Sequence, residues 1–95
     1  MNEALGMIEV FGVAHSILIA DSMLKTSNVR ILSTEEVSQA YYTMVIAGDV
    51  EAVHMAIEQG REIAQKAGVF IASKVIARPM QETITSMLKN RRNII

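Results

Sequence analysis

The sequence contains no cysteine and no tryptophan, and it has one proline among 95 residues. Without cysteine there are no disulfides, no thiolate metal ligands and no cysteine nucleophile, so a cytoplasmic location is the default expectation. No apolar run approaches the roughly 18 residues that a transmembrane helix needs. The first residues include neither a basic stretch nor a long apolar one. We therefore expect no signal peptide and no membrane partner.

An excess of charge of one sign is also missing, because nine basic and ten acidic residues give a formal net charge of −1. This balance provides no general attraction to nucleic acid, and no basic–glycine–aromatic motif of an RNA-reading sheet is present. We expect no nucleic-acid partner. The chain is instead 51% hydrophobic, which is much for one small domain to bury. Self-association is therefore expected.

Four segments have the apolar and β-branched composition of strands. They span residues 3–11, 29–33, 41–47 and 69–77. The polar stretch 34–40 has no clear period, and we predict that it is a loop.

Two segments have the period of amphipathic helices. The first covers residues 13–26, and its predicted buried stripe consists of Val13, Ile17, Ala20 and Leu24. The second runs from Val50 to Ala67, with Asp49 as the expected N-cap and Gly68 as the expected C-cap. Its predicted buried stripe consists of Val53, Ala56, Ile57, Gly60, Ile63 and Ala64. Gly60 lies inside this helix at a cost of about 1 kcal/mol relative to alanine, which indicates a close approach to the sheet.

The resulting element order, β-α-β-β-α-β, predicts an α+β fold of the ferredoxin-like, split βαβ type. Its four-stranded antiparallel sheet would carry both helices on one face and leave the other face partly bare. A short C-terminal helix is expected at 81–89, followed by a flexible basic tail at about 89–95. No linker interrupts the chain, so residues 1–95 are predicted to form a single domain.

Candidate catalytic or metal-binding residues are few. His54 has Glu51 and Glu58 one helical turn away on either side, but a solvated surface cluster is the favoured interpretation. Glu35 and Glu36 are adjacent in the predicted loop and need not converge. No glycine spacing typical of phosphate loops and no nucleophile elbow occurs. We expect no enzyme activity, no cofactor and no metal.

Five segments, in this order and spacing, resemble one known family: residues 3–9 (EALGMIE), 20–25 (ADSMLK), 27–29 (SNV), 48–53 (GDVEAV) and 75–79 (VIARP). The chain is similar, over about residues 3–80, to the hexamer-forming shell proteins of bacterial microcompartments. This resemblance implies a homo-hexamer with a central pore that passes small metabolites. It further implies a structural protein in the microcompartment shell of the cytoplasm, with neighbouring hexamers, shell paralogues and encapsulated enzymes as partners.

The resemblance also assigns roles to individual residues. Lys25, Asn28 and Arg78 match the family's contacts at the edges of neighbouring hexamers. From the residues alone, simpler interpretations stay open. Lys25 could be a solvated lysine near a helix C-terminus, Asn28 a turn former and Arg78 a surface charge before a proline.

The pore positions depart from the family pattern. Ser38, Gln39 and Ala40 stand where typical members have a Gly-Ser-Gly-like turn. Gln39 is longer than serine, so copies of it around one axis would narrow the opening. Loss of glycine restricts positive φ, and we expect the turn to differ. Phe11 replaces a frequent lysine and Met80 a common histidine, which indicates a divergent paralogue.

The main alternative is a small ferredoxin-like module that binds or senses a ligand as a dimer or trimer. An acylphosphatase-type enzyme would need an anion-binding loop that is absent from the sequence. An RNA reader is disfavoured by the charge and by the missing aromatic motif.

Overall fold

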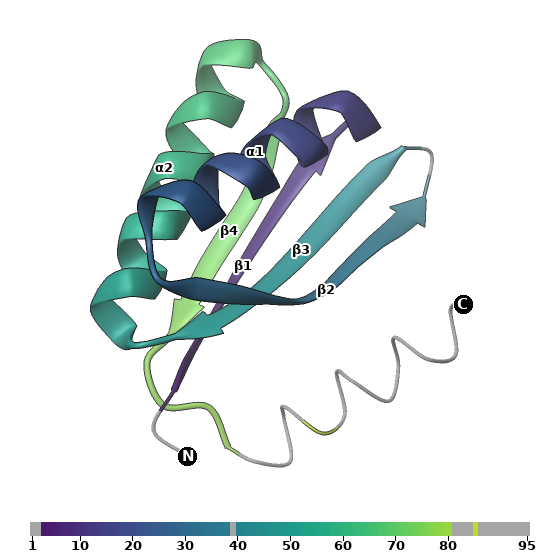
Figure 1. Cartoon of the computed structure of the whole chain (residues 1–95). Coiled ribbons are helices and arrows are strands. Elements are labelled where there is room, and N and C mark those ends of the chain that lie inside the picture. The colour runs from purple at the N-terminus through teal and green to yellow at the C-terminus, as the bar shows by residue number, and fades with distance from the viewer. Residues whose placement is uncertain (1–2, 39, 81–84, 86–95) are drawn as a thin grey trace.

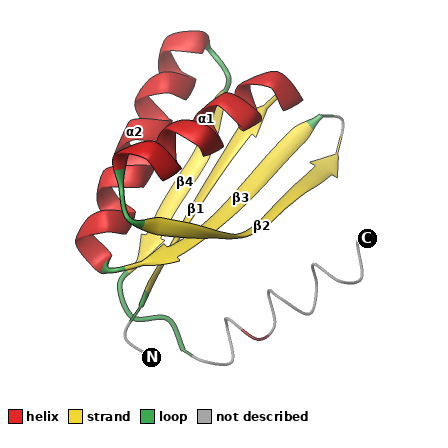
Figure 2. Ribbon diagram, viewed as in Figure 1, coloured by secondary structure: helices red, strands yellow, loops and turns green. Residues whose placement is uncertain are grey.

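The computed structural model describes residues 3–38, 40–80 and 85. Its elements follow one another as β1 (Ala4–Phe11), α1 (Val13–Thr26), β2 (Val29–Ser38), β3 (Tyr41–Gly48), α2 (Val50–Ala67) and β4 (Phe70–Ile76). The four strands form one antiparallel sheet in the order β2-β3-β1-β4. Both helices cover the same face of the sheet (Figures 1 and 2). The predicted ferredoxin-like arrangement is confirmed, while the expected C-terminal helix and tail lie outside the described residues apart from Thr85.

The predicted loop at 34–40 is wrong for residues 34–38, which continue β2 to Ser38. Thr34, Glu35 and Glu36 pair with Met44, Thr43 and Tyr42 of β3. β2 is an edge strand, and polar or charged side chains are common on such strands because they discourage pairing with other chains. The main-chain ladder to β3 therefore holds this polar segment in a strand without an apolar pattern.

α2 packs on the sheet as predicted. Its buried residues are Val53, Ala56, Ile57, Gly60 and Ala64, with Ile63 partly buried against them. Gly68 caps the helix in the left-handed conformation at φ 74°, as expected. Asp49 is the N-cap residue, but its side chain makes no capping hydrogen bond.

Two glycines allow the close packing of α2 against its neighbours. A Cβ at Gly6 of β1 would lie 2.7 Å from Val53 and 2.8 Å from Ile57. At Gly60, a Cβ would lie 3.0 Å from Ile19 of α1 and 3.2 Å from Ile8 of β1. The close approach inferred from Gly60 is confirmed, and it involves α1 as well as the sheet.

The predicted buried stripe of α1 is wrong. The residues that α1 buries are Ser16, Ile19 and Met23. Ser16 is accommodated because its hydroxyl donates to the carbonyl of Val13 at 2.7 Å. Of the predicted stripe, Ala20 is partly buried, whereas Val13, Ile17 and Leu24 are 53%, 65% and 47% exposed. The helix therefore carries more apolar surface than the described residues cover.

The strand register defines two ends of the sheet. At one, here called the hairpin end, Phe11 lies opposite Tyr41, and Val10 lies opposite Phe70. At the other, here called the far end, Gly48 lies between Ala4 and Val29. An eight-residue strand separates the two ends by about 26 Å at the usual rise of a strand.

The face of the sheet away from the helices is here called the open face. Beginning with Leu5, alternate residues of β1 point to it. Its apolar part centres on the far half and consists of Leu5, Val45 and Ala47, with Met7 and Leu32 packed against them. Toward the hairpin end, the same face carries Glu9, Thr43 and Glu35, which lie side by side on three strands. Among the described residues, no helix is long and apolar enough to cross a membrane.

Candidate functional site

The turn between β2 and β3 contains the three predicted pore residues. Gln39 and the side chain of Ser38 lie outside the described part of the chain. Ala40 has φ 70°, a left-handed conformation that normally favours glycine. Ala40 therefore has a positive φ although it carries a side chain. That the turn differs from the family pattern stays a prediction.

A hydrogen bond ties this turn to the start of α1. The N–H of Gly12 donates to the carbonyl of Ala40 at 2.8 Å, and Gly12 itself has φ 94°. The N–H of Phe11 donates to the carbonyl of Val69 at 2.9 Å. The hydrogen bond between Gly12 and Ala40 thus fixes the end of the turn to the body of the domain.

The three predicted edge residues all belong to segments at the far end. Lys25 lies in the last turn of α1, 74% exposed, with its ammonium 2.9 Å from the carboxylate of Asp21. Asn28 precedes β2 and Arg78 follows β4, and both are exposed. No hydrogen bond or ion pair joins the three side chains within the described residues. The fold therefore places these residues at one end of the sheet and Ser38 and Ala40 at the other.

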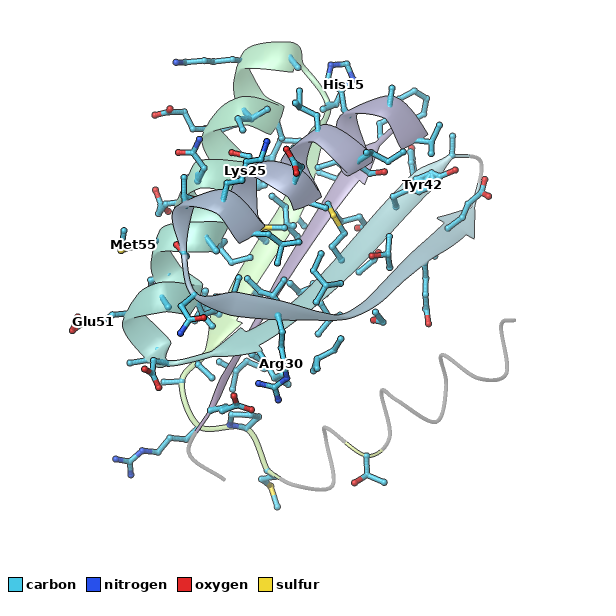
Figure 3. All side chains as sticks on the ribbon, viewed as in Figure 1. His15, Lys25, Arg30, Tyr42, Glu51 and Met55 are labelled. Atoms are coloured by element: carbon cyan, nitrogen blue, oxygen red, sulfur yellow. The ribbon has the colours of Figure 1, made fainter. Side chains whose placement is uncertain are left out.

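A groove beside Asn28 was not expected from the sequence. It runs between the α1–β2 turn and the first turns of α2, and its lining consists of Thr26, Ser27, Asn28, Asp49, Val50, Glu51, Ala52 and Met55. Val50 and Met55 are exposed there. Figure 3 places Glu51 and Met55 on the side of the molecule away from Tyr42, which lies near the hairpin end. Most of its lining belongs to the motifs 27–29 and 48–53, but the sequence does not show that these two distant segments meet.

An ion pair secures the edge of the sheet next to the groove. The guanidinium of Arg30 donates two hydrogen bonds to the carboxylate of Glu3. These bonds lower the pKa of Glu3 and raise the pKa of Arg30, because each group stabilises the charged form of the other. The pair links the start of β1 to β2 across the far end.

An aromatic pair next to the predicted pore turn was also missed. The rings of Phe11 and Tyr41 meet edge to face, with centroids 5.6 Å apart and an angle of 69° between their planes. Phe11 is 50% and Tyr41 40% exposed. The alternation of β1 could have placed Phe11 on the open face, but its partner depends on the register with β3.

The candidate catalytic residues do not form a site. His54, Glu51 and Glu58 are exposed on α2, and the described residues contain no group of three or more side chains able to hold a metal ion. Glu35 pairs with Thr43 and Glu36 with Tyr42. Neighbouring residues of a strand point to opposite faces, so the two carboxylates diverge.

The sequence is similar to a known protein family and to individual members of it. The model of the BMC domain family matches residues 4–79. The chain is 40% identical over 83 residues to the bacterial microcompartment shell protein EutK of Salmonella typhimurium, covering 87% of this chain and 51% of EutK. It is 39% identical over 80 residues to the carboxysome shell protein CsoS1A of Hydrogenovibrio crunogenus, covering 83% of each chain.

A solved structure gives the same result for the fold. A microcompartment protein from Desulfitobacterium hafniense superposes with a TM-score of 0.83 at 28% identity, covering 94% of this chain and 48% of that one. The chain thus spans about half the length of EutK and of this structural neighbour.

Proposed function

The chain belongs to the BMC domain family, and we propose that it is a structural subunit of a bacterial microcompartment shell. Its subunits associate into a cyclic homo-hexamer, and hexamers meet edge to edge, with shell paralogues as further neighbours and the enzymes inside the shell as further partners. Ser38, Gln39 and Ala40 line the central opening, through which small metabolites pass. Lys25, Asn28 and Arg78 make contacts between hexamers.

The observation that carries this proposal is the separation of the two predicted sites. A ring subunit needs its pore residues near the axis and its edge residues at the rim. The turn 38–40 lies at the hairpin end, and the edge residues lie at the far end, about one strand length away. A subunit whose strands run from the axis of the ring to its rim meets both requirements at once.

The exposed stripe of α1 supports a neighbour at the flank of the subunit. Ser22 marks the side of α1 that faces α2, because its hydroxyl accepts a hydrogen bond from Gln59 at 3.1 Å. At 100° per residue, Val13, Ile17 and Leu24 lie on roughly the opposite side of α1. That side faces away from α2, above the β2 edge of the sheet. A second copy against this flank would bury the apolar surface that the described residues leave exposed.

The proposed edge role of Lys25 is supported by its position and its chemistry. An exposed lysine has a long apolar stem that can lie along a neighbouring surface while its ammonium donates up to three hydrogen bonds. Asp21 holds the ammonium at the rim in the single chain. The groove beside Asn28, with the exposed Val50 and Met55, adds apolar surface where a neighbouring hexamer would arrive.

In this proposal, the chain works through assembly and has no catalytic role. A ring of Gln39 side chains narrows the opening relative to the serine of typical members, because glutamine is longer and carries both a donor and an acceptor. The ligand-binding dimer or trimer is the second candidate, and the groove beside Asn28 would then be its ligand site.

The decisive experiment compares Lys25→Asp with the matched variant Lys66→Asp. Both lysines lie in the last turn of a helix, are 74% and 79% exposed, and pair with an acid one turn earlier. We expect both variants to keep rings of about six copies by light scattering, as in closed cyclic oligomers. Only Lys25→Asp should lose the extended layers that electron microscopy detects in the wild type.

The two parts of the proposal fail separately. Layers that form as readily with Lys25→Asp would show that Lys25 is no edge contact. A wild-type chain that forms only dimers or trimers, with a melting temperature that depends on a ligand, would favour the second candidate.

A further inference from the structure

The open face carries an unusual group of side chains directly beside the turn 38–40. Phe11 and Tyr41 occupy the last ladder positions of β1 and β3 at the hairpin end. They are two of the four aromatic residues in the chain, and both are 40% or more exposed. Their edge-to-face contact leaves ring surface of each residue accessible.

Two carboxylates lie on the same face, one step further from the turn. Glu9 is two residues before Phe11 on β1, so both point to the open face. Thr43 lies between Glu9 and Glu35 on the neighbouring strands, and its hydroxyl donates to Glu9 at 3.2 Å. Tyr41 is the diagonal neighbour of both Glu9 and Glu35. Diagonal neighbours in a sheet are about 7–8 Å apart. We call Glu9, Phe11, Glu35, Tyr41 and Thr43 the Phe11 cluster.

No cation neutralises these carboxylates within the described residues. The ion pairs of this part of the chain involve other acids, namely Glu3, Asp21, Glu58 and Glu62. On the open face, Lys74 of β4 lies opposite Met7, one side-chain position further from the turn than Glu9. The Phe11 cluster therefore combines aromatic faces, which are electron-rich, with net negative charge.

We propose that the Phe11 cluster binds small organic cations of the alkylammonium class at the mouth of the pore. The inference rests on the proposed function, since a ring would bring one cluster from every subunit around the same opening. Aromatic faces attract ammonium groups through their quadrupole, and nearby carboxylates add Coulomb attraction. The same charges repel small anions. The opening thus selects by charge as well as by width.

The test is a titration of assembled rings with tetramethylammonium chloride, followed by the NMR signals of the Phe11 and Tyr41 rings. tert-Butanol serves as a neutral probe of similar size, and sodium acetate as an anion. We expect a saturable shift with tetramethylammonium and none with acetate. tert-Butanol should bind at least about threefold more weakly, the effect of one exposed cation–π contact.

Variants separate the cluster from the rest of the surface. Phe11→Leu and Glu9→Gln should each weaken tetramethylammonium binding about threefold to fivefold. Glu51→Gln removes an exposed carboxylate near the far end and should leave binding unchanged. Glu9→Gln keeps the test valid if Phe11→Leu does not fold.

The outcomes distinguish this inference from the proposed function. Rings that form but respond equally to tetramethylammonium and tert-butanol overturn the role of the Phe11 cluster alone. The same holds if folded Phe11→Leu and Glu9→Gln rings both bind like the wild type. A chain that forms no rings by light scattering overturns the proposed function, and the pore-mouth site with it.

Discussion

The two helices lie on the same face of one sheet, yet they use their apolar residues in opposite ways. α2 turns its apolar stripe inward, where Val53, Ala56 and Ile57 are buried against β1 and its neighbours. α1 buries Ile19 and Met23 but leaves Ile17 and Leu24 outside. The apolar pattern of α2 thus serves the core of the single chain. The apolar pattern of α1 includes residues that this core does not bury.

An amphipathic period therefore identifies an apolar face of a helix but not the surface against which that face packs. The period of α1 is genuine, but the stripe at Val13, Ile17 and Leu24 is on the flank. In the proposed ring, that flank is an interface. The stripe that is wrong as a prediction of the core then contacts a neighbouring subunit.

Ile17→Ser tests whether the exposed flank of α1 is an interface between subunits, and Leu18→Ser is its matched control. The two residues are 65% and 53% exposed, and they lie about 100° apart around α1. Burial of one isoleucine contributes about 2 kcal/mol per interface, so Ile17→Ser should dissociate the rings. Leu18→Ser should leave them intact. Light scattering measures the mass, and circular dichroism should report an unchanged fold for both. Rings that persist with Ile17→Ser would exclude the flank as an interface.

A second pair of variants examines the inward packing of α2. Gly6→Ala places a Cβ within 2.7 Å of Val53 and should cost about 2 kcal/mol of unfolding free energy. Gly60→Ala meets looser contacts, 3.0 Å at the nearest. It also gains about 1 kcal/mol of helix propensity, so its net effect should be small. Urea unfolding at one fixed protein concentration measures the change in unfolding free energy for both variants. Equal losses would contradict the tighter approach at Gly6.

The smallest expected effect concerns the turn at the hairpin end. Ala40→Gly relieves the left-handed backbone at φ 70° and should stabilise the chain by about 0.5–1 kcal/mol. Ala14→Gly, at an exposed position of α1, should destabilise it by about 1 kcal/mol. Thermal unfolding compares the two. A loss of stability with Ala40→Gly would mean that the turn does not strain Ala40.

The features predicted correctly are those that depend on residues close together in the chain. α2 could be placed from Val50 to Ala67 because its period, its cap at Gly68 and Gly60 are local signals. The element order then left few ways to arrange four strands and two helices. The loop predicted at 34–40 is wrong over residues 34–38 because main-chain pairing with β3 holds them in a strand. Such pairing needs no apolar pattern in the segment itself.

The candidate sites also divide into those that local motifs predicted and those that only the fold revealed. Lys25, Asn28 and Arg78 were found as motifs, and the fold adds only that they share the far end. The Phe11–Tyr41 pair and the groove beside Asn28 could not be found in this way. Each joins segments that are distant in sequence, so each depends on the strand register or on helix placement.

The element order, the inward stripe of α2 and the family could be predicted without the structure, because periodicity, caps and motifs depend on neighbouring residues. The buried face of α1, the length of β2 and the contact of Phe11 with Tyr41 beside the turn became visible only in the folded chain. These features depend on non-local pairing and packing, where a shift of one residue moves every side chain of a strand to the other face of the sheet.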